Sequence, residues 1–355
     1  MNHQNCLTWL KSQNEYPKFY WKNKYSQESI ASSGIKKKLS KLTPSKHFAN
    51  CVFDFELHNM NIWVPKYEVS SLQPFEKFND SLDRIEKYEI VHKSFLPDFS
   101  LWKNLLLKAK DIQKVVLART TYLKLDKTIC PFLLMQRLEK KAGSAHLFFY
   151  QPHEGTTLLG ASPETLFMRE EDCIFSEAIA GTRKLGKTES ENRQIFHEFI
   201  NSKKDIEEFS YVDNFLSDNF RELCKNYKKS ELNILKTPWV QHFQKTFQGQ
   251  LKEQLSDWSL LKKFHPTPAV GGIPVNDALA FIEKNEPFAR NYYAAPIGRA
   301  SKDKSEFAVG IRSCLIKNDT IQVFAGTGLV KDSQPQSEWE ELDSKTRWIY
   351  EMLNA

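Results

Sequence analysis

The chain has 355 residues, of which 41% are hydrophobic and 13% aromatic, and its formal net charge is +6. This composition excludes a disordered chain and allows a large core, arranged as two domains or as one large α/β unit. No apolar stretch reaches the length of a membrane span, and the first residues lack the charged-then-apolar pattern of a secretory signal, so we expect a cytoplasmic protein without a membrane partner.

Cysteines and lysine runs give no sign of a metal or nucleic-acid site. The six cysteines are far apart and form no CxxC pair, which favours reduced thiols over a disulfide scaffold or a zinc site. The lysine runs at 36–38 and 228–229 are not interleaved with aromatic residues. A solvated surface therefore explains the positive charge better than a nucleic-acid partner does.

The first hundred residues contain no grouping of side chains with an evident chemical role. Alternation of apolar and polar residues predicts strands at 53–57 and 62–69, and the pattern at 80–88 predicts a helix. We interpret residues 1–100 as an N-terminal scaffold.

Several elements are predicted from residue 101 onward. An amphipathic stretch at 101–112 leads into residues 114–119 (KVVLAR), whose β-branched side chains predict a strand. A lysine at the start of a strand is usually exposed, so the local pattern alone assigns Lys114 no function. Further strands are predicted at 146–150, 157–159 and 175–183, helical structure over 192–224, and a helix ending at 260–264 before a rigid loop at 265–272.

An acidic helix follows a glycine-rich strand end near the C-terminus. Residues 305–330 read as a strand, a turn and a second strand that ends in AGTG at 325–328. On the following helix, Glu338, Glu341 and Lys345 share one face, which could hold a hard cation together with an anion. Such a face is more often merely solvated, but glycines at a strand end let a ligand approach the backbone.

Segments spread along residues 101–355 resemble the chorismate-utilising enzymes and occur in the order typical of that family. The family includes isochorismate, salicylate, anthranilate and aminodeoxychorismate synthases, and the chain looks closest to the menaquinone-type isochorismate synthases. The segments are KVVLAR (114–119), GASPE (160–164), AGT (180–182), HPTPAVGG (265–272), YAAPIG (293–298), GIR (310–312), GTG (326–328) and EWEE (338–341) with Lys345.

The resemblance implies a fold and a site. The fold would be a single large α/β (α+β) domain of two packed antiparallel sheets flanked by helices, with residues 101–355 as the region that binds chorismate. Glu208 and Glu341 would coordinate Mg²⁺ with Glu338 close by, a ligand set that suits a hard ion. The resemblance further assigns substrate contacts to Gly181, Thr182, Arg312, Gly326, Gly328 and Lys345. His242 is a candidate contact, and a satisfied core histidine explains it equally well.

The resemblance also points to one reaction within the family. Ammonia-using members generally lack a lysine at the position of Lys114, so Lys114 would be the general base that directs water to C2 of chorismate. Glu164 would be the general acid for the departing C4 hydroxyl. The expected enzyme is an isomerase that forms isochorismate for menaquinone or siderophore synthesis, without an obligatory amidotransferase. Glu177, in SEAIAGT at 176–182, would help to select this reaction, or would be a strand-edge charge.

Three positions depart from the family pattern. Phe209 stands where histidine is usual, and Asn291 and Ala295 replace glycines in a loop; asparagine tolerates positive φ and alanine is small. These departures keep other functions open: a salicylate synthase, an ammonia-using anthranilate or aminodeoxychorismate synthase component, and a catalytically silent chorismate-binding protein.

Overall fold

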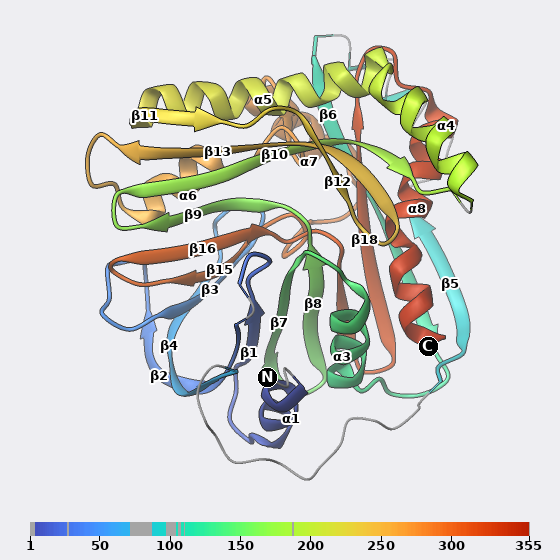
Figure 1. Cartoon of the computed structure of the whole chain (residues 1–355). Helices are drawn as coiled ribbons and strands as arrows, with labels where there is room; N and C mark the ends of the chain where they lie inside the picture. The colour runs from blue at the N-terminus through green and yellow to red at the C-terminus, as the bar shows by residue number, and fades with distance from the viewer. Residues whose placement is uncertain are drawn as a thin grey trace.

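A computed structural model describes residues 4–26, 28–71, 87–96, 104–105, 108–109, 111–186 and 188–354. Runs of consecutive strands are separated by helices along this part of the chain (Figure 1). The strands are β1 (Lys18–Lys22), β2 (Ser29–Leu39), β3 (Ala49–Phe53), β4 (Met60–Ser70), β5 (Ile90–Leu96), β6 (Lys114–Leu125), β7 (His146–His153), β8 (Thr156–Ser162), β9 (Thr165–Glu170), β10 (Cys173–Lys184), β11 (Cys224–Lys229), β12 (Asn233–Lys236), β13 (Val240–Leu251), β14 (Gly272–Ile273), β15 (Pro296–Ala300), β16 (Lys304–Val309), β17 (Ser313–Lys317) and β18 (Thr320–Leu329). The helices are α1 (Gln4–Ser12), α3 (Pro131–Lys141), α4 (Glu189–Ile200), α5 (Lys203–Leu223), α6 (Asp257–Phe264), α7 (Val275–Asn285) and α8 (Pro335–Leu353).

Antiparallel pairs join the strands into one connected network. The order is β5–β6–β18–β17–β8–β7–β1–β2–β4–β3–β15–β16–β9–β10–β13, with β11 and β12 on β13 and β14 on β6. In Figure 1, β6, β18, β8 and β7 run roughly upright, whereas β9, β10, β13 and β16 run across the view. The expected α/β class is confirmed. Hydrogen-bonded pairs connect the upright strands to the crossing strands without a break.

Helix α5 covers the strands β10, β11 and β13 (Figure 1). Its residues Phe209, Val212, Leu216 and Phe220 recur at helical spacing and are all buried, so one apolar face packs against the sheet. The Ser202 hydroxyl accepts a hydrogen bond from the Asp205 backbone N–H and caps the helix start. This packing fixes the first turns of α5, which carry the polar residues of the site.

Helix α8 lies against strand β18. Leu342, Ile349 and Met352 are fully buried on its packed side, which fixes the rotation of the helix about its axis. Glu338, Glu341 and Lys345 are therefore presented toward the end of β18.

Most elements predicted from residue 114 onward are confirmed, including the strand that begins at Lys114 and the helical stretch, which divides into α4 and α5. The strand predicted at 53–57 is wrong beyond Phe53, because Leu57 has φ 60° and the Asp54 carboxylate accepts the Asn59 backbone N–H at 3.0 Å, so a turn forms there. The helix predicted over 80–88 lies largely, and the amphipathic stretch at 101–112 partly, outside the described residues. Within the described part, no helix is both long and apolar enough to cross a membrane.

Candidate active site

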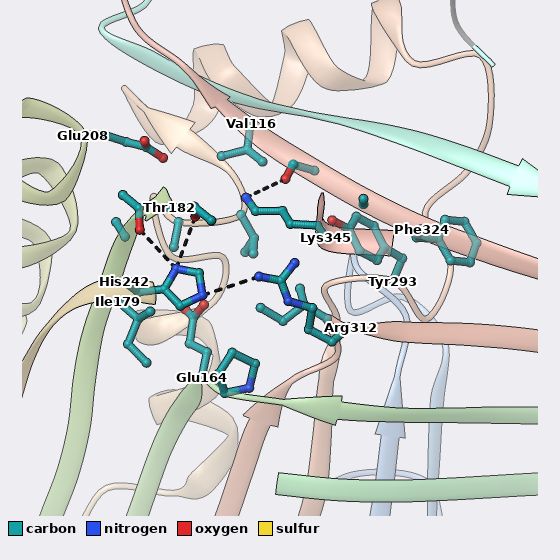
Figure 2. Close-up of a pocket in the computed structure, with 18 residues that line it drawn as sticks. Val116, Glu164, Ile179, Thr182, Glu208, His242, Tyr293, Arg312, Phe324 and Lys345 are labelled. Carbon is teal, nitrogen blue, oxygen red and sulfur yellow. Dashed lines mark hydrogen bonds between the residues drawn. The ribbon is translucent and has the colours of Figure 1, made fainter. Parts of the chain in front are cut away.

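A cavity opens where strands β6, β10, β13 and β18 meet helices α5 and α8 and four connecting segments, at 163–164, 269–270, 293 and 311–312 (Figure 2). Figure 2 shows Glu164, His242, Arg312 and Lys345 arranged around one space. The lining residues are Val116, Pro163, Glu164, Ile179, Ala180, Gly181, Thr182, Glu208, His242, Ala269, Val270, Tyr293, Ile311, Arg312, Phe324, Ala325, Gly326 and Lys345.

Glu164 occupies the short connection between β8 and β9, where Pro163 restricts the backbone. Its side chain is buried, and its backbone N–H donates to the Ser162 hydroxyl at 3.2 Å. The Thr267 hydroxyl, from the predicted rigid loop, donates to Glu164 Oε1 at 3.2 Å. Burial raises the pKa of Glu164 to about 7, so this carboxyl can hold a proton at neutral pH.

Lys114, the first residue of β6, has an exposed fraction of 0% although a lysine at a strand start is usually exposed. Its Nζ lies 3.3 Å from Glu208 Oε1. Burial lowers the pKa of Lys114, while the charge of Glu208 opposes that shift. Lys114 does not line the cavity itself, but its partner Glu208 does, so the amine lies one side chain behind the cavity wall.

Gly328 packs closely against the side chains of both Lys114 and Glu208. A Cβ at Gly328 would lie 2.3 Å from Glu208 Oε1 and 2.9 Å from Lys114 Cε, whereas one at Gly326 would meet the Tyr293 hydroxyl at 2.8 Å. The glycines at the end of β18 thus make room for side chains of the site as well as for an approaching ligand.

Replacing Gly328 by alanine should lower turnover by roughly 10²-fold, because the new methyl group would displace the Glu208 carboxylate and the Lys114 amine. Glu208 Oε1 and Lys114 Cε, the atoms nearest to the new methyl group, belong to the ends of flexible side chains, so the melting temperature should change little. Turnover and thermal unfolding measured on the same preparation check this expectation. Wild-type turnover in a folded Gly328→Ala variant would contradict it.

His242 and Arg312 form a second polar pair in the cavity (Figure 2). His242 Nδ1 lies 3.0 Å from the Gly181 carbonyl oxygen, which assigns the ring proton to Nδ1 and leaves Nε2 to accept from the Arg312 guanidinium at 3.4 Å. Burial and then the Arg312 charge lower the pKa of His242 to about 3, so the ring is neutral. His242 is thus both a satisfied buried histidine and a lining residue, and Arg312 remains a cation at neutral pH because burial lowers its pKa only to about 10.

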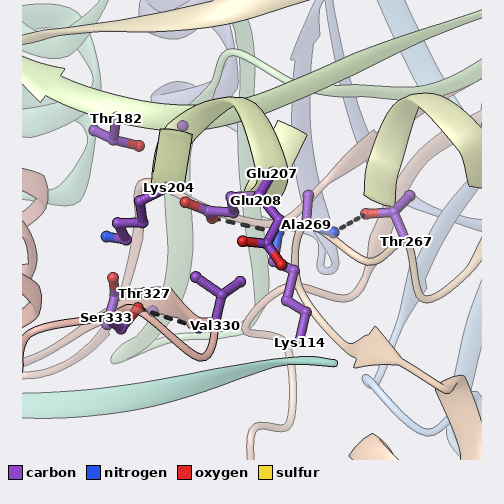
Figure 3. A network of polar contacts seen from close by, with 12 residues as sticks. Lys114, Thr182, Lys204, Glu207, Glu208, Thr267, Ala269, Thr327, Val330 and Ser333 are labelled. Atoms are coloured by element: carbon purple, nitrogen blue, oxygen red, sulfur yellow. Dashed lines mark hydrogen bonds and ion pairs between the residues drawn. The ribbon is translucent and has the colours of Figure 1, made fainter. Parts of the chain in front are cut away.

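Each of the three carboxylates expected to bind metal contacts a lysine (Figure 3 shows part of this network). Glu208 pairs with Lys114, Glu338 lies 2.5 Å from Lys204 Nζ, and Glu341 lies 2.6 Å from Lys345 Nζ. Among the residues that the structure describes, no three Asp, Glu, His or Cys side chains converge as a ready metal cluster.

The Thr327 hydroxyl connects two of these carboxylates. It lies 2.5 Å from Glu338 Oε2 and 3.0 Å from Glu341 Oε1, although a hydroxyl has only one hydrogen to donate. Burial and then the charge of Glu341 raise the pKa of Glu338, whereas Lys345 and Lys204 outweigh burial and lower the pKa of Glu341 to about 2. The buried carboxylate oxygens of Glu338 and Glu341 attract cations and are donors of the type that a hard divalent ion takes.

The structure brings most predicted site residues to the cavity wall and places the others directly behind it. Glu164, Gly181, Thr182, Glu208, His242, Arg312, Gly326 and Lys345 line the cavity. Lys114, Gly328 and Glu341 contact lining residues, and Glu338 is linked to Glu341 through the Thr327 hydroxyl. Sequence reasoning missed Lys204, Thr267, Tyr293 and Thr327. Of these, only Lys204 gives a local signal, because it precedes Glu208 by one helical turn.

The three departures from the family pattern lie outside the cavity lining. Phe209 is buried against Phe243, with ring centroids 5.8 Å apart. Asn291 adopts φ 47°, a conformation that asparagine tolerates, and Ala295 has no positive φ. The loop thus forms its positive-φ turns without glycine, at Asn291 and at Ala294, whose φ is 60°.

Residues 102–354 match the family model described as chorismate binding enzyme. The chain belongs to this family. It is 40% identical over 251 residues to isochorismate synthase MenF of Bacillus subtilis (70% of this chain, 53% of the relative) and 34% identical over 274 residues to the chloroplastic isochorismate synthase of Catharanthus roseus (74% and 47%). The chain thus spans about half the length of these two curated relatives.

A relative of similar size and two solved structures complete the comparison. Isochorismate synthase MenF of Haemophilus influenzae is 29% identical over 98% of this chain and 89% of the relative. The structure of the menaquinone-specific isochorismate synthase MenF of Escherichia coli superposes with a TM-score of 0.87 at 24% identity, covering 99% of this chain and 92% of the other. A putative 2,3-dihydroxybenzoate-specific isochorismate synthase, DhbC of Bacillus anthracis, gives 0.83 at 22% identity over 98% of both chains. These two likenesses concern the fold.

Proposed function

We propose that this protein is a Mg²⁺-dependent isochorismate synthase that converts chorismate to isochorismate. The observation that carries the proposal is a buried carboxyl in the cavity wall, Glu164, together with a buried amine, Lys114, directly behind the lining residue Glu208. Burial lowers the pKa of the amine and raises that of the carboxyl, and each charge acts on the other group. A base and an acid whose pKa values are displaced toward each other suit a reaction that adds water and removes hydroxide at neutral pH.

In the proposed reaction, neutral Lys114 takes a proton from a water molecule whose oxygen bonds to C2 of the ring. The two ring double bonds shift, the bond from C4 to its hydroxyl breaks, and Glu164 gives its proton to the departing oxygen. One water enters and one leaves, so the change is an isomerisation. Lys114 ends protonated and Glu164 ends ionised, and exchange of one proton restores both groups.

Chorismate is an anion, and the cavity presents two cationic side chains to it. The Arg312 guanidinium can bind a carboxylate with two parallel hydrogen bonds. Lys345 is held in place by the Gly326 carbonyl at 3.0 Å and by Glu341 at 2.6 Å. We assign recognition of the substrate's anionic groups to these two residues.

Glu208, Glu338 and Glu341 would hold the magnesium ion. When bound, the ion would neutralise a carboxylate of the substrate next to the reacting ring. The Lys204 ammonium is already paired with Glu338. The charges of Glu338, Glu341 and Glu208 outweigh burial and raise the pKa of Lys204, so its side chain is a cation at neutral pH. Lys204 thus competes with a divalent cation for the same carboxylates.

Replacing Lys204 by methionine should tighten Mg²⁺ binding by roughly tenfold, the effect of about 1.4 kcal/mol, because the competing charge is removed. Isothermal titration with Mg²⁺ in the absence of chorismate measures this directly. Lys203→Met, one residue away and exposed, is the matched control and should bind as the wild type does. Weaker binding by Lys204→Met would show that the ammonium supports the metal site.

Product analysis tests the proposed function. Purified protein with chorismate and Mg²⁺ should form isochorismate at the same rate with and without ammonium, as separated by chromatography. Salicylate would indicate a salicylate synthase, and an amine that depends on ammonium would indicate an ammonia-using enzyme. Chorismate that stabilises the protein without turnover would indicate a silent binder. The position of Phe209 and Asn291 outside the cavity lining favours a catalytic protein.

We propose menaquinone synthesis as the pathway served. Curated relatives carry the name MenF, and the solved structure from Escherichia coli is described as menaquinone-specific. The siderophore alternative rests on isochorismate synthase EntC of Escherichia coli, which is 27% identical over 83% of this chain.

A further inference from the structure

A buried ion pair stands directly behind the proposed general acid. Lys24, just after strand β1, pairs with Glu177 on strand β10, and their side chains are 2% and 0% exposed. Neither residue lines the cavity. A buried ion pair costs desolvation free energy and is by itself weak evidence of a contribution to stability.

The ion pair holds the chain on both sides of Glu164. Lys24 Nζ donates to the carbonyl of Pro163 at 2.6 Å, and Glu177 Oε1 accepts the backbone N–H of Thr165 at 2.9 Å. The residues before and after Glu164 are thus anchored by the two partners of one pair. The second oxygen of Glu177 accepts from Gln244 Nε2 at 2.7 Å, which fixes the orientation of the carboxylate.

The same pair places two opposite charges near the Glu164 carboxyl. Glu177 raises the pKa of Glu164 and Lys24 lowers it, both less than burial does. The other charged or titratable groups that interact with Glu164 are Lys114, Arg312 and Tyr293. With both partners present, the charges of Lys24 and Glu177 oppose each other, whereas loss of one partner leaves the other unbalanced.

We propose that Lys24 and Glu177 are positioning residues for the general acid: they fix the backbone on both sides of Glu164 and balance the charge behind its carboxyl. This inference rests on the proposed function of Glu164. It assigns a role in catalysis to a residue of the first hundred positions, and it explains Glu177 better than a strand-edge charge does, because Glu177 is fully buried and bonded on both oxygens.

The test compares Lys24→Met, Lys24→Arg and Glu177→Gln with the wild type by the pH dependence of kcat/KM for chorismate. Lys24→Met should lower kcat/KM by roughly 10²-fold, and Lys24→Arg should restore much of it. The alkaline limb should move up by roughly one pH unit in Lys24→Met, where the Glu177 charge is unbalanced, and down in Glu177→Gln. If Lys24→Met does not fold, the downward shift in Glu177→Gln decides alone, since glutamine keeps the size of the side chain.

Asp257→Asn is the matched control, because it breaks another buried ion pair, with Arg169, that touches no cavity residue. This variant should change the melting temperature and leave the alkaline limb of the pH dependence of kcat/KM unchanged. Unchanged limbs in Lys24→Met and Glu177→Gln, with only a lower melting temperature, would overturn the inference while leaving the proposed function intact. A wild type that forms no isochorismate would overturn the proposed function instead. Infrared titration of Glu164, by difference from Glu164→Gln, then measures the same shifts without turnover.

Discussion

Replacing Lys114 by methionine should reduce isochorismate formation by roughly 10²- to 10⁴-fold, the usual contribution of a positioned general base. Methionine has nearly the length and volume of the lysine stem and leaves no large cavity at a position with 0% exposure. The variant lacks the amine that would take the proton from water. Chorismate should still raise its melting temperature, because Arg312 and Lys345 remain in the cavity.

Lys124→Met is the matched control on the same strand. Lys124 lies near the other end of β6, is exposed and pairs with Asp319 at the surface, so its loss should leave turnover unchanged. Chromatographic product analysis of both variants and of the wild type gives the comparison. Turnover of Lys114→Met within a fewfold of the wild type would show that another group activates the water.

Local patterns predicted the elements that carry the site. Helical spacing placed Glu341 and Lys345 on one face of α8, and the structure joins them at 2.6 Å. The glycine-rich end of β18 was expected to permit close approach, and a Cβ at Gly328 would collide with Glu208. Both features depend on residues close together in the chain, where spacing determines geometry.

Burial and long-range pairing could not be predicted from local patterns. Lys114 resembles an ordinary exposed strand end, and its burial depends on segments distant in the chain, including β14, which pairs with it, and Glu208 of α5. The partners of Glu164 come from distant segments, because Thr267 lies on a loop more than a hundred residues away. The local pattern favoured a solvated acidic face on α8, yet Glu338 is 0% exposed. Its buried carboxylate pairs with Lys204 of α5, a partner that local spacing does not indicate.

Replacing Glu164 by glutamine should lower kcat by roughly 10²- to 10⁴-fold, because the amide cannot supply a proton to the departing hydroxyl. Glutamine keeps the shape of the side chain, and its amide oxygen can still accept the Thr267 hydroxyl. The fold should therefore survive, as thermal unfolding will show. Isochorismate formation at single-turnover and steady-state conditions separates the loss of chemistry from any change in binding.

The pH dependence of the wild type follows from the two shifted pKa values. Glu164 must be protonated to act as an acid, so kcat/KM should fall as the pH rises through about 7, the raised pKa of this carboxyl. Lys114 must be neutral to act as a base, so kcat/KM should fall again as the pH drops through its lowered pKa. The residual activity of Glu164→Gln should lack the alkaline limb and keep the acid limb. An alkaline limb that persists in Glu164→Gln would assign that proton to another group and remove Glu164 from the role of general acid.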